Sequence, residues 1–320
     1  MHFKSITYAS PQPGPRLIVL GAVHGNELAG TKGILRVIEE LESGQVALAQ
    51  GRVTFVPITN PLAYEKQQRA GDRNLNRNLS PTKDINEFED QIANWLCPLL
   101  AEHEVLLDLH SFQAQGKAFA MIGPLDNTGP LEPFSHAAKE EALALRLGVD
   151  RIVDGWLATY AGGVERRLAR LGNNASRKDL LLADAKYGVG TTEYMRSQGG
   201  WSITLECGQH NDPHAPEVAY RAIRNTLAHL GLVAEADPAP AREVEALHLF
   251  TVIDKLDAAD TFAKPWTSFD AVSAGEVIGT RANGEVVKAE CDGRIVFPNA
   301  KAGAGEEWFY LAQHNARFDA

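Results

Sequence analysis

Short apolar runs alternate with helix-like segments along the first two thirds of the chain. Residues 16–21 read RLIVLG, a continuous apolar run that is typical of a strand buried on both faces of a sheet. Residues 28–43 follow, with apolar side chains from Ile34 to Leu41 at the spacing of one helix face. Strands alternating with helices indicate an α/β domain with a mixed or parallel sheet flanked by helices. Further strands are predicted at 53–60, 105–110, 118–123 and 201–208, and further helices at 85–100, 135–147 and 216–230.

The pattern changes after residue 232. Residues 233–246 are rich in alanine, proline and acidic residues, which is typical of a linker. Beyond them come short alternating runs broken by glycines, and Asn283-Gly284 lies between two such runs as expected for a hairpin turn. We therefore expect an α/β domain over residues 1–232, a linker over 233–246 and a small all-β domain over 247–320.

Composition narrows the class of protein. The chain is 44% hydrophobic and 22% charged, as ordinary globular proteins are. The net charge of -10 argues against nucleic acid as a partner. Three cysteines without a Cys-x-x-Cys pair make a disulfide framework or a cysteine-built zinc site improbable. No apolar run is long enough for a membrane span and none resembles a signal peptide, so we expect a cytoplasmic protein; a homo-oligomer is one open option.

Two histidines and a glutamate follow predicted strands. His24 and Glu27 lie three residues apart in GAVHGNE, directly after the first strand, so they can reach one point. His110 ends the apolar run at 105–110, and Asp108 points to the same strand face as a potential support for His110. A catalytic zinc site usually takes three protein ligands of these types and leaves one position open. Taken singly, each residue is also compatible with a structural role, such as capping a turn.

A further glutamate and an arginine-rich segment could complete a hydrolytic site. Glu206 lies at the end of the strand SITLECG, where a carboxylate is poorly solvated unless it faces a site or a salt-bridge partner. Such a group is a good general base for a zinc-activated water. Residues 69–77 read RAGDRNLNR, and an arginine fork there could bind a carboxylate or an oxyanion, although a solvated polar loop is the alternative.

With these motifs the chain resembles the succinylglutamate desuccinylase/aspartoacylase family, a branch of the metallocarboxypeptidase-like zinc hydrolases. The resemblance extends over roughly residues 16–230, with a small β domain after it as in those enzymes. Four motifs carry it in order: Gly-x-x-His-Gly-Asn-Glu at 21–27, Asn-Leu-Asn-Arg at 74–77, Asp-Leu-His at 108–110 and Glu-x-Gly at 206–208.

The resemblance implies a role for each site residue. One Zn²⁺ per chain would be held by His24, Glu27 and His110, with Glu206 as the general base. The other implied roles are stabilisation of the carbonyl oxygen by Arg69, binding of a substrate carboxylate by Asn76 and Arg77, and binding of a second carboxylate by Arg196.

The function implied by this family is zinc-dependent deacylation of a small, carboxylate-bearing N-acyl amino acid. The C-terminal β domain is expected to cap the active site. A metallocarboxypeptidase acting on peptides would use the same ligand geometry, and a catalytically silent binding protein is the alternative from another class.

Overall fold

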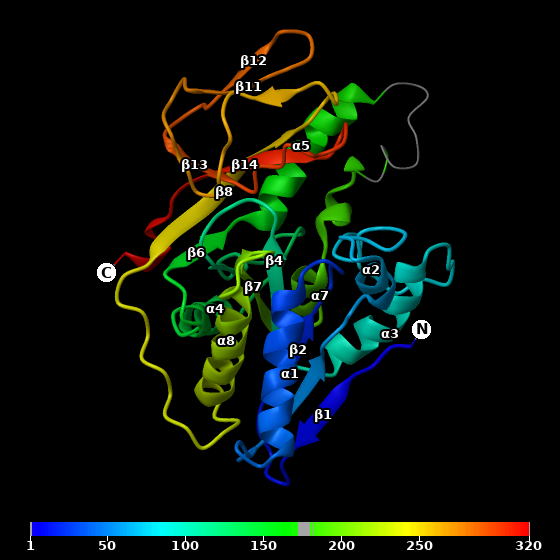
Figure 1. The fold of residues 1–320 in the computed structure, drawn as a ribbon, viewed down its shortest axis with the longest axis vertical. Coiled ribbons are helices and arrows are strands. Elements are labelled where there is room, and N and C mark those ends of the chain that lie inside the picture. Colours follow the sequence, from blue (N-terminus) through cyan, green and yellow to red (C-terminus); the bar gives the residue numbers. More distant parts are fainter. Residues whose placement is uncertain (1, 172–179, 181, 320) are drawn as a thin grey trace. The chain divides into compact units, whose positions relative to one another are not determined.

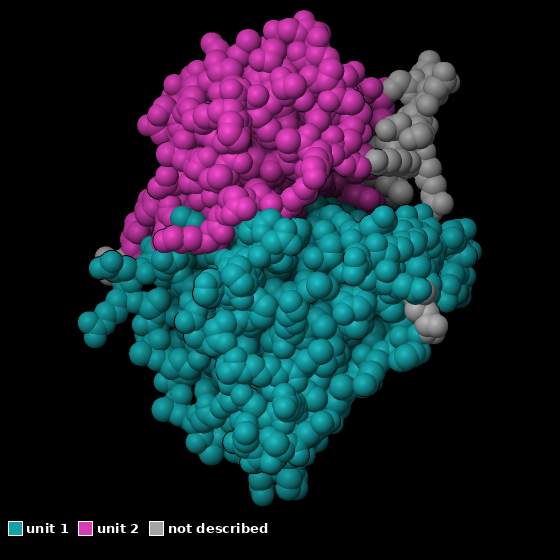
Figure 2. Space-filling view, viewed as in Figure 1, with its two compact units in different colours: residues 1–112, 118–152, 189–244 teal, residues 113–117, 153–188, 245–320 magenta. Residues whose placement is uncertain are grey.

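The computed structural model describes residues 2–171, 180 and 182–319 and divides into two compact units. The first contains residues 1–112, 118–152 and 189–244, and the second contains 113–117, 153–188 and 245–320 (Figure 2). The candidate site residues named above all belong to the first unit.

A largely parallel sheet forms the centre of the first unit (Figure 1). Its strand order is β1-β3-β2-β4-β7-β5, in which β3, β2, β4 and β7 run parallel, while β1 pairs antiparallel with β3 and β5 pairs antiparallel with β7. All eight residues of β4 are buried, including the polar Asp108, His110 and Ser111. The strand bounds are β1 Ile6–Ala9, β2 Arg16–Gly21, β3 Arg52–Val56, β4 Val105–Phe112, β5 Phe119–Met121 and β7 Trp201–Gln209.

Helices cover both faces of this sheet. The apolar faces of α3 and α7 pack with β2 and β4 in one core that includes Ile18, Leu106, Ile92 and Met195. Helices α1 and α8 pack against each other and against the strands β2, β4 and β7 (Figure 1). The predicted α/β class with flanking helices is thus confirmed. The helices are α1 Leu28–Glu42, α2 Pro61–Lys66, α3 Phe88–Ala101, α4 Ala137–Ala144, α7 Thr191–Ser197 and α8 Ala215–His229.

The second unit combines an antiparallel sheet with one long helix. Its strands follow the order β8-β14-β13-β10, and a smaller sheet has the order β12-β11-β9. The predicted hairpin at Asn283-Gly284 joins β11 to β12, and Gly284 adopts φ 86° there. The strand bounds are β8 Glu245–Asp254, β9 Thr261–Phe262, β10 Ala271–Val272, β11 Val277–Thr280, β12 Val286–Lys288, β13 Gly293–Val296 and β14 Glu307–His314; the helical elements are α5 Trp156–Arg170, η1 Ala185–Gly188 and η2 Ala316–Phe318.

The compact units differ from the predicted domain boundaries at residues 153–188 and, over a shorter stretch, at residues 113–117. Residues 153–188, which lie within the predicted α/β domain of residues 1–232, pack with the C-terminal strands. The buried guanidinium of Arg167 in α5 forms two hydrogen bonds, of 3.1 and 2.8 Å, with the Asp254 carboxylate at the end of β8. The Thr159 hydroxyl donates to Leu249 O at 2.6 Å. These long-range contacts have no counterpart in local sequence pattern. Strand β6 (Arg151–Asp154) lies at the boundary of the two units.

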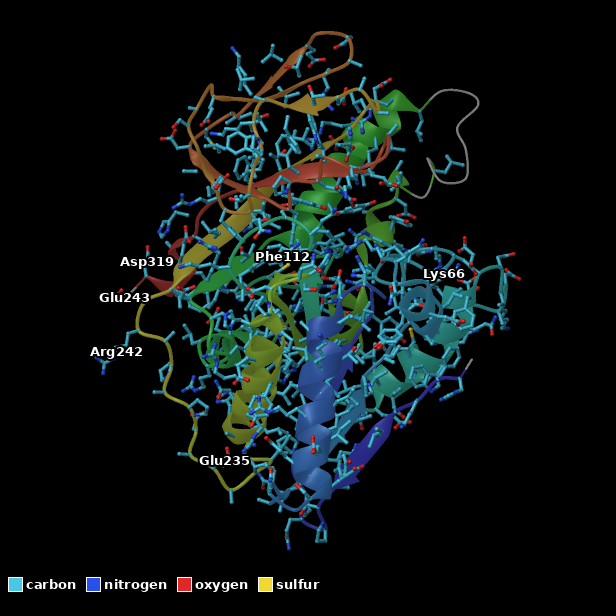
Figure 3. The ribbon with its side chains drawn as sticks, in the orientation of Figure 1. Lys66, Phe112, Glu235, Arg242, Glu243 and Asp319 are labelled. Atoms are coloured by element: carbon cyan, nitrogen blue, oxygen red, sulfur yellow. The ribbon has the colours of Figure 1, made fainter. Side chains whose placement is uncertain are left out.

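Residues 230–244 connect α8 to β8, and residues 234–244 of this connection form no helix or strand. Glu235, Arg242 and Glu243 are exposed, and Figure 3 shows them spaced along this extended segment. The predicted linker overlaps this stretch, but its last two residues already belong to β8. Among the described residues, no helix combines the length and the apolar character needed to cross a bilayer.

The buried carboxylate of Asp260 should make the stability of the second unit depend on pH. Its carboxylate accepts hydrogen bonds from Arg281 Nη1 at 2.8 Å, Leu256 N at 2.8 Å and Ala282 N at 2.9 Å. Burial alone would raise the pKa of Asp260, but these donors lower it to about 2. A depressed folded-state pKa stabilises the protein above pH about 4 and loses this effect as the pH falls toward 2.

We therefore expect Asp260→Asn to lower the free energy of unfolding at pH 7 by about 2 kcal/mol. The difference from wild type should shrink between pH 4 and pH 2 in urea unfolding followed by circular dichroism. Asp257→Asn is the matched control, because the exposed Asp257 side chain accepts the Ala259 amide at 2.8 Å and no charged donor contacts it among the described residues. A difference that stays constant with pH would contradict the assigned pKa.

Candidate metal centre and active site

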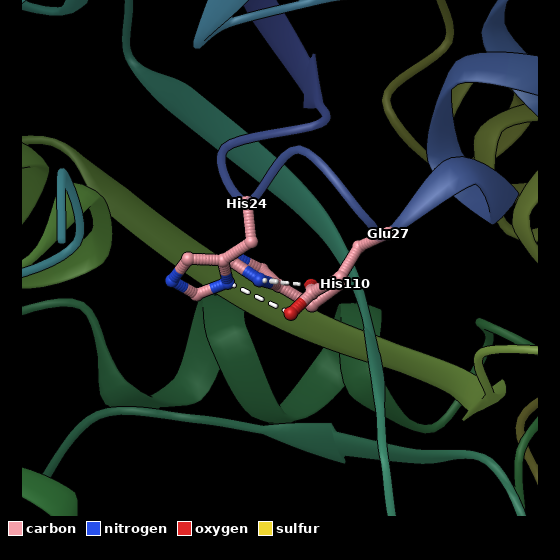
Figure 4. Close-up of side chains that lie close together, drawn as sticks. All are labelled: His24, Glu27 and His110. Atoms are coloured by element: carbon pink, nitrogen blue, oxygen red, sulfur yellow. Dashed lines mark hydrogen bonds and ion pairs between the residues drawn. The ribbon is translucent and has the colours of Figure 1, made fainter. Parts of the chain in front are cut away.

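The three predicted metal ligands meet at the carboxyl ends of β2 and β4. Potential ligand atoms of His24, Glu27 and His110 all lie within 4.8 Å of one another. His24 Nδ1 is 2.8 Å from Glu27 Oε1, and His110 Nδ1 is 2.9 Å from Glu27 Oε2 (Figure 4). The three side chains are 2%, 2% and 3% exposed, so this is a buried polar cluster that requires internal partners.

Local backbone structure explains why these side chains converge. Strands β2 and β4 are parallel neighbours, so their carboxyl ends lie at one edge of the sheet. The turn between β2 and α1 is closed by the Glu27 amide, which donates to His24 O at 3.2 Å. Glu27 directly precedes α1, and His24 and Glu27 therefore reach toward His110 from a short, ordered turn.

The donor set fits a zinc ion. Burial and the charge of Arg69 lower the pKa of His24 to about 4, so its imidazole is neutral and can act as a ligand. Burial would raise the pKa of Glu27, but His24 and His110 hold it well below its ordinary value, so Glu27 is a carboxylate.

The Nε2 atoms of both imidazoles, which face away from Glu27, also have hydrogen-bond partners. His24 Nε2 lies 2.9 Å from Asn74 Oδ1, and His110 Nε2 lies 2.9 Å from Asp108 Oδ2. If each Nε2 carries a hydrogen, each Nδ1 is left as a lone-pair donor facing Glu27. Asp108 thus lies behind His110, where the sequence predicted it.

Glu206 stands beside the cluster on the neighbouring strand β7. His110 and Glu206 are paired in the parallel register of β4 and β7. Burial is the main cause that raises the pKa of Glu206 to about 8, with His110 lowering it and Glu27 raising it. Its buried Oε2 has no hydrogen-bond partner among the described residues. A carboxyl group of this kind can accept and return a proton near neutral pH.

A histidine that sequence reasoning did not select lies next to this edge. The register of β4 and β7 shifts between the pairs His110–Glu206 and Phe112–Gln209, which is a bulge with one extra residue in β7. After the bulge, His210 Nδ1 lies 2.9 Å from Ser111 Oγ, and the Ser111 amide donates to Glu27 Oε2 at 3.1 Å. Regular strand alternation cannot predict this placement, although the flexible Gly208 beside it marks an irregular strand end.

Arg69 reaches the ligand cluster from the polar segment. Its Nη1 donates to Glu27 Oε1 at 3.0 Å and lies 3.2 Å from His24 Nδ1, while the side chain is 53% exposed. The segment is anchored by the fully buried Glu89 carboxylate of α3, which accepts the amides of Gly71, Asp72 and Arg73 at 3.0–3.2 Å. The RAGDRNLNR segment is therefore an ordered loop over the site rather than a solvated one.

Asn76 and Arg77 lie in the same loop. Asn76 N donates to Asn74 Oδ1 at 2.9 Å, and that oxygen also contacts His24 Nε2. Arg77 is nearly buried, and its Nη1 donates to Asn76 O at 2.8 Å. Asn76 is therefore connected to the predicted ligand His24 through the Asn74 side chain, and Arg77 is connected to it through Asn76.

Arg196 is not brought to the cluster. In α7 its Nε donates to Glu140 Oε1 at 2.8 Å, its Nη1 to Glu132 Oε1 at 2.9 Å and its Nη2 to Ser202 O at 3.0 Å. Its side chain is 4% exposed, and none of the contacts described for it involves a predicted metal ligand. These contacts give no support to the predicted binding of a second substrate carboxylate, because the guanidinium donors already have buried partners.

The first unit is therefore an α/β domain that carries a buried His-Glu-His cluster at the ends of parallel strands. Residues 13–128 match the succinylglutamate desuccinylase/aspartoacylase catalytic domain, which confirms the resemblance seen in the motifs. The matched segment includes the site residues His24, Glu27, Arg69, Asn76, Arg77, Asp108 and His110, whereas Arg196 and Glu206 lie beyond it.

Individual relatives agree with this match. Succinylglutamate desuccinylase of Shewanella denitrificans is 25% identical over 316 residues, covering 91% of this chain and 80% of the relative. The crystal structure of succinylglutamate desuccinylase/aspartoacylase from Rhodobacter sphaeroides aligns with a TM-score of 0.70 at 17% identity, over 98% of this chain and 90% of that one. The product-bound ectoine utilization protein EutE (DoeB) from Ruegeria pomeroyi gives a TM-score of 0.70 at 18% identity, over 97% and 88%. The structural matches show a shared fold.

The Arg196 contacts lead to a stability prediction. The Glu140 carboxylate is fully buried and accepts from Arg196, Gly123 N and Ser202 N. We expect Glu140→Gln to lower the free energy of unfolding by about 3 kcal/mol, because it leaves a buried guanidinium short of charge compensation. Urea unfolding at pH 7 measures this loss.

Glu132→Gln is the matched control. Glu132 also pairs with Arg196 but is more exposed, and burial raises its pKa to about 7, so part of its charge is already lost at neutral pH. Its replacement should cost about 1 kcal/mol or less. Equal losses in the two variants would show that Glu140 has no special role in holding Arg196.

Proposed function

We propose that this protein is a zinc-dependent deacylase that hydrolyses the amide bond of a small, carboxylate-bearing N-acyl amino acid. The observation that carries the proposal is the buried His24-Glu27-His110 cluster with Glu206 paired beside it in the register of β4 and β7. The names of the matching family and relatives, desuccinylase and aspartoacylase, support amide hydrolysis as the reaction class.

The chain's own residues divide the work of hydrolysis. Zinc held by His24, Glu27 and His110 would supply a Lewis acid that makes a water acidic and polarises the amide carbonyl. Glu206 takes one proton from the attacking water and transfers it to the nitrogen of the leaving amine. A C–O bond forms and the C–N bond breaks, and the second proton of the water passes from the new carboxylic acid to the amine. The products are a carboxylate and an amino acid with a free, protonated amino group.

Arginine and asparagine side chains bind the substrate in this proposal. Arg69 reaches the ligand cluster and donates to the carbonyl oxygen as negative charge develops on it, a type of contact worth about 3–4 kcal/mol. Asn76 and Arg77 hold the carboxylate of the amino-acid half. Arg196 receives a structural role here, because Glu140 and Glu132 already engage its guanidinium.

The reaction class is tested by release of free amine from a panel of substrates. The panel contains N-acetyl and N-succinyl derivatives of acidic, neutral and basic amino acids, together with dipeptides that have a free C-terminus. We expect chelator-sensitive release from at least one N-acyl amino acid and restoration by Zn²⁺. Release from the dipeptides alone would identify a carboxypeptidase, and no release by zinc-loaded protein would favour a silent binding protein.

The general base is tested by Glu206→Gln, which keeps the shape of the side chain but cannot accept the proton. We expect kcat to fall by about 10²–10⁴-fold, the usual contribution of general acid–base catalysis. Zinc content, measured by atomic emission, should stay at that of wild type. Glu217→Gln in α8 is the control, since Glu217 pairs with Arg36 on the surface. Near-normal turnover by Glu206→Gln would rule out the assignment.

A further inference from the structure

The first residue of α7, Thr191, contacts the support of His110. The Thr191 hydroxyl donates to Asp108 Oδ2, the same oxygen that lies 2.9 Å from His110 Nε2. Asp108 is fully buried, and its other oxygen, Oδ1, has no hydrogen-bond partner in the described part of the chain. Because Asp108 is fully buried, its carboxylate depends on the two side-chain donors His110 and Thr191 for its stabilisation.

The backbone of Thr191 contacts the support of the other histidine ligand. Thr191 N donates to Asn76 Oδ1 at 2.9 Å, and Asn76 N donates to Asn74 Oδ1 at 2.9 Å. Asn74 Oδ1 in turn lies 2.9 Å from His24 Nε2. One continuous series of hydrogen bonds thus joins the two imidazoles: His24, Asn74, Asn76, Thr191, Asp108 and His110.

The residue before Thr191 must be small for this connection to exist. A Cβ atom on Gly190 would lie 2.1 Å from Asn76 Oδ1, which is far inside contact distance. The Gly190 amide donates to Glu193 Oε2 at 2.8 Å, so the start of α7 is itself held in place. The amide of Thr191 can reach Asn76 only because the chain approaches so closely here.

We propose that Thr191 is a positioning residue for the metal centre. Its hydroxyl holds Asp108 and its amide holds Asn76, and together they orient both imidazoles with Nδ1 toward Glu27. The inference rests on the metal-binding part of the proposed function. Thr191 thus contacts both the loop that is proposed to bind the substrate carboxylate, through Asn76, and the residue behind His110, Asp108. A change at Thr191 should therefore affect both substrate binding and metal binding.

Zinc affinity separates this role from a general structural one. Thr191→Val keeps the size and branching of the side chain but removes the hydroxyl, and we expect Zn²⁺ to bind about 10-fold more weakly, as for other residues that orient metal ligands. The dissociation constant is measured by competition with a chromogenic chelator. Thr191→Ser retains the hydroxyl and should restore wild-type affinity.

A neighbouring threonine supplies the matched control. Thr192 has the same size and lies in the same turn, but its hydroxyl donates to Glu193 Oε1 at 3.0 Å, away from Asp108. Thr192→Val should therefore bind Zn²⁺ as wild type does, with both variants folded by circular dichroism. An equal loss in Thr192→Val, or no loss in Thr191→Val, would overturn the inference.

A double-mutant cycle tests the contact of Thr191 with Asp108, and a variant at Gly190 tests its contact with Asn76. Asp108→Asn and Thr191→Val act on one bond, so their effects on affinity should be less than additive when combined. Gly190→Ala displaces Asn76 and should weaken Zn²⁺ binding and raise KM together. Wild-type protein that binds no Zn²⁺ would refute the proposed function itself, whereas tight wild-type binding with full additivity would refute only the role of Thr191.

Discussion

The site in the first unit depends on one interaction, the contact of the buried Glu27 carboxylate with the imidazoles of His24 and His110. A carboxylate that is 2% exposed is costly unless charge and hydrogen bonds compensate it. Glu27 accepts from Ser111 N and from Arg69, and the Nδ1 atoms of both imidazoles face its two oxygens. The strand ends, the polar loop and the start of α7 are arranged to satisfy this one group and the histidines beside it.

Residues outside the His24-Glu27-His110 cluster hold its side chains in place. Parallel strands β2, β4 and β7 bring their carboxyl ends to one edge, which is the usual place for a site in an α/β sheet. Glu89 orders the loop that carries Arg69 by accepting consecutive backbone amides. Thr191 then connects this loop to the support of His110. Support of this kind is what keeps ligands in the geometry that a metal requires.

Two buried ionisable groups of the first unit show how a candidate catalytic group differs from a structural ion pair. Glu206 has a buried oxygen without a hydrogen-bond partner among the described residues and a pKa raised to about 8, so a proton can join and leave it near neutral pH. Arg196 is as deeply buried, but carboxylates and a carbonyl oxygen occupy its donors. Burial alone does not identify a functional residue; an incomplete set of partners beside a ligand cluster is more informative.

The sequence by itself determined the α/β class and the strands that carry His110 and Glu206, and it pointed to the candidate ligand set, because apolar periodicity and short motifs are local properties of the chain. The tertiary structure alone decided the positions of Thr191 and His210, the partners of Arg196 and the association of residues 153–188 with the C-terminal strands. Each of these rests on a hydrogen bond, an ion pair or a strand bulge between residues far apart in the chain. Such contacts leave no periodicity in the sequence, since what selects them is the need to satisfy buried polar groups after the chain has folded.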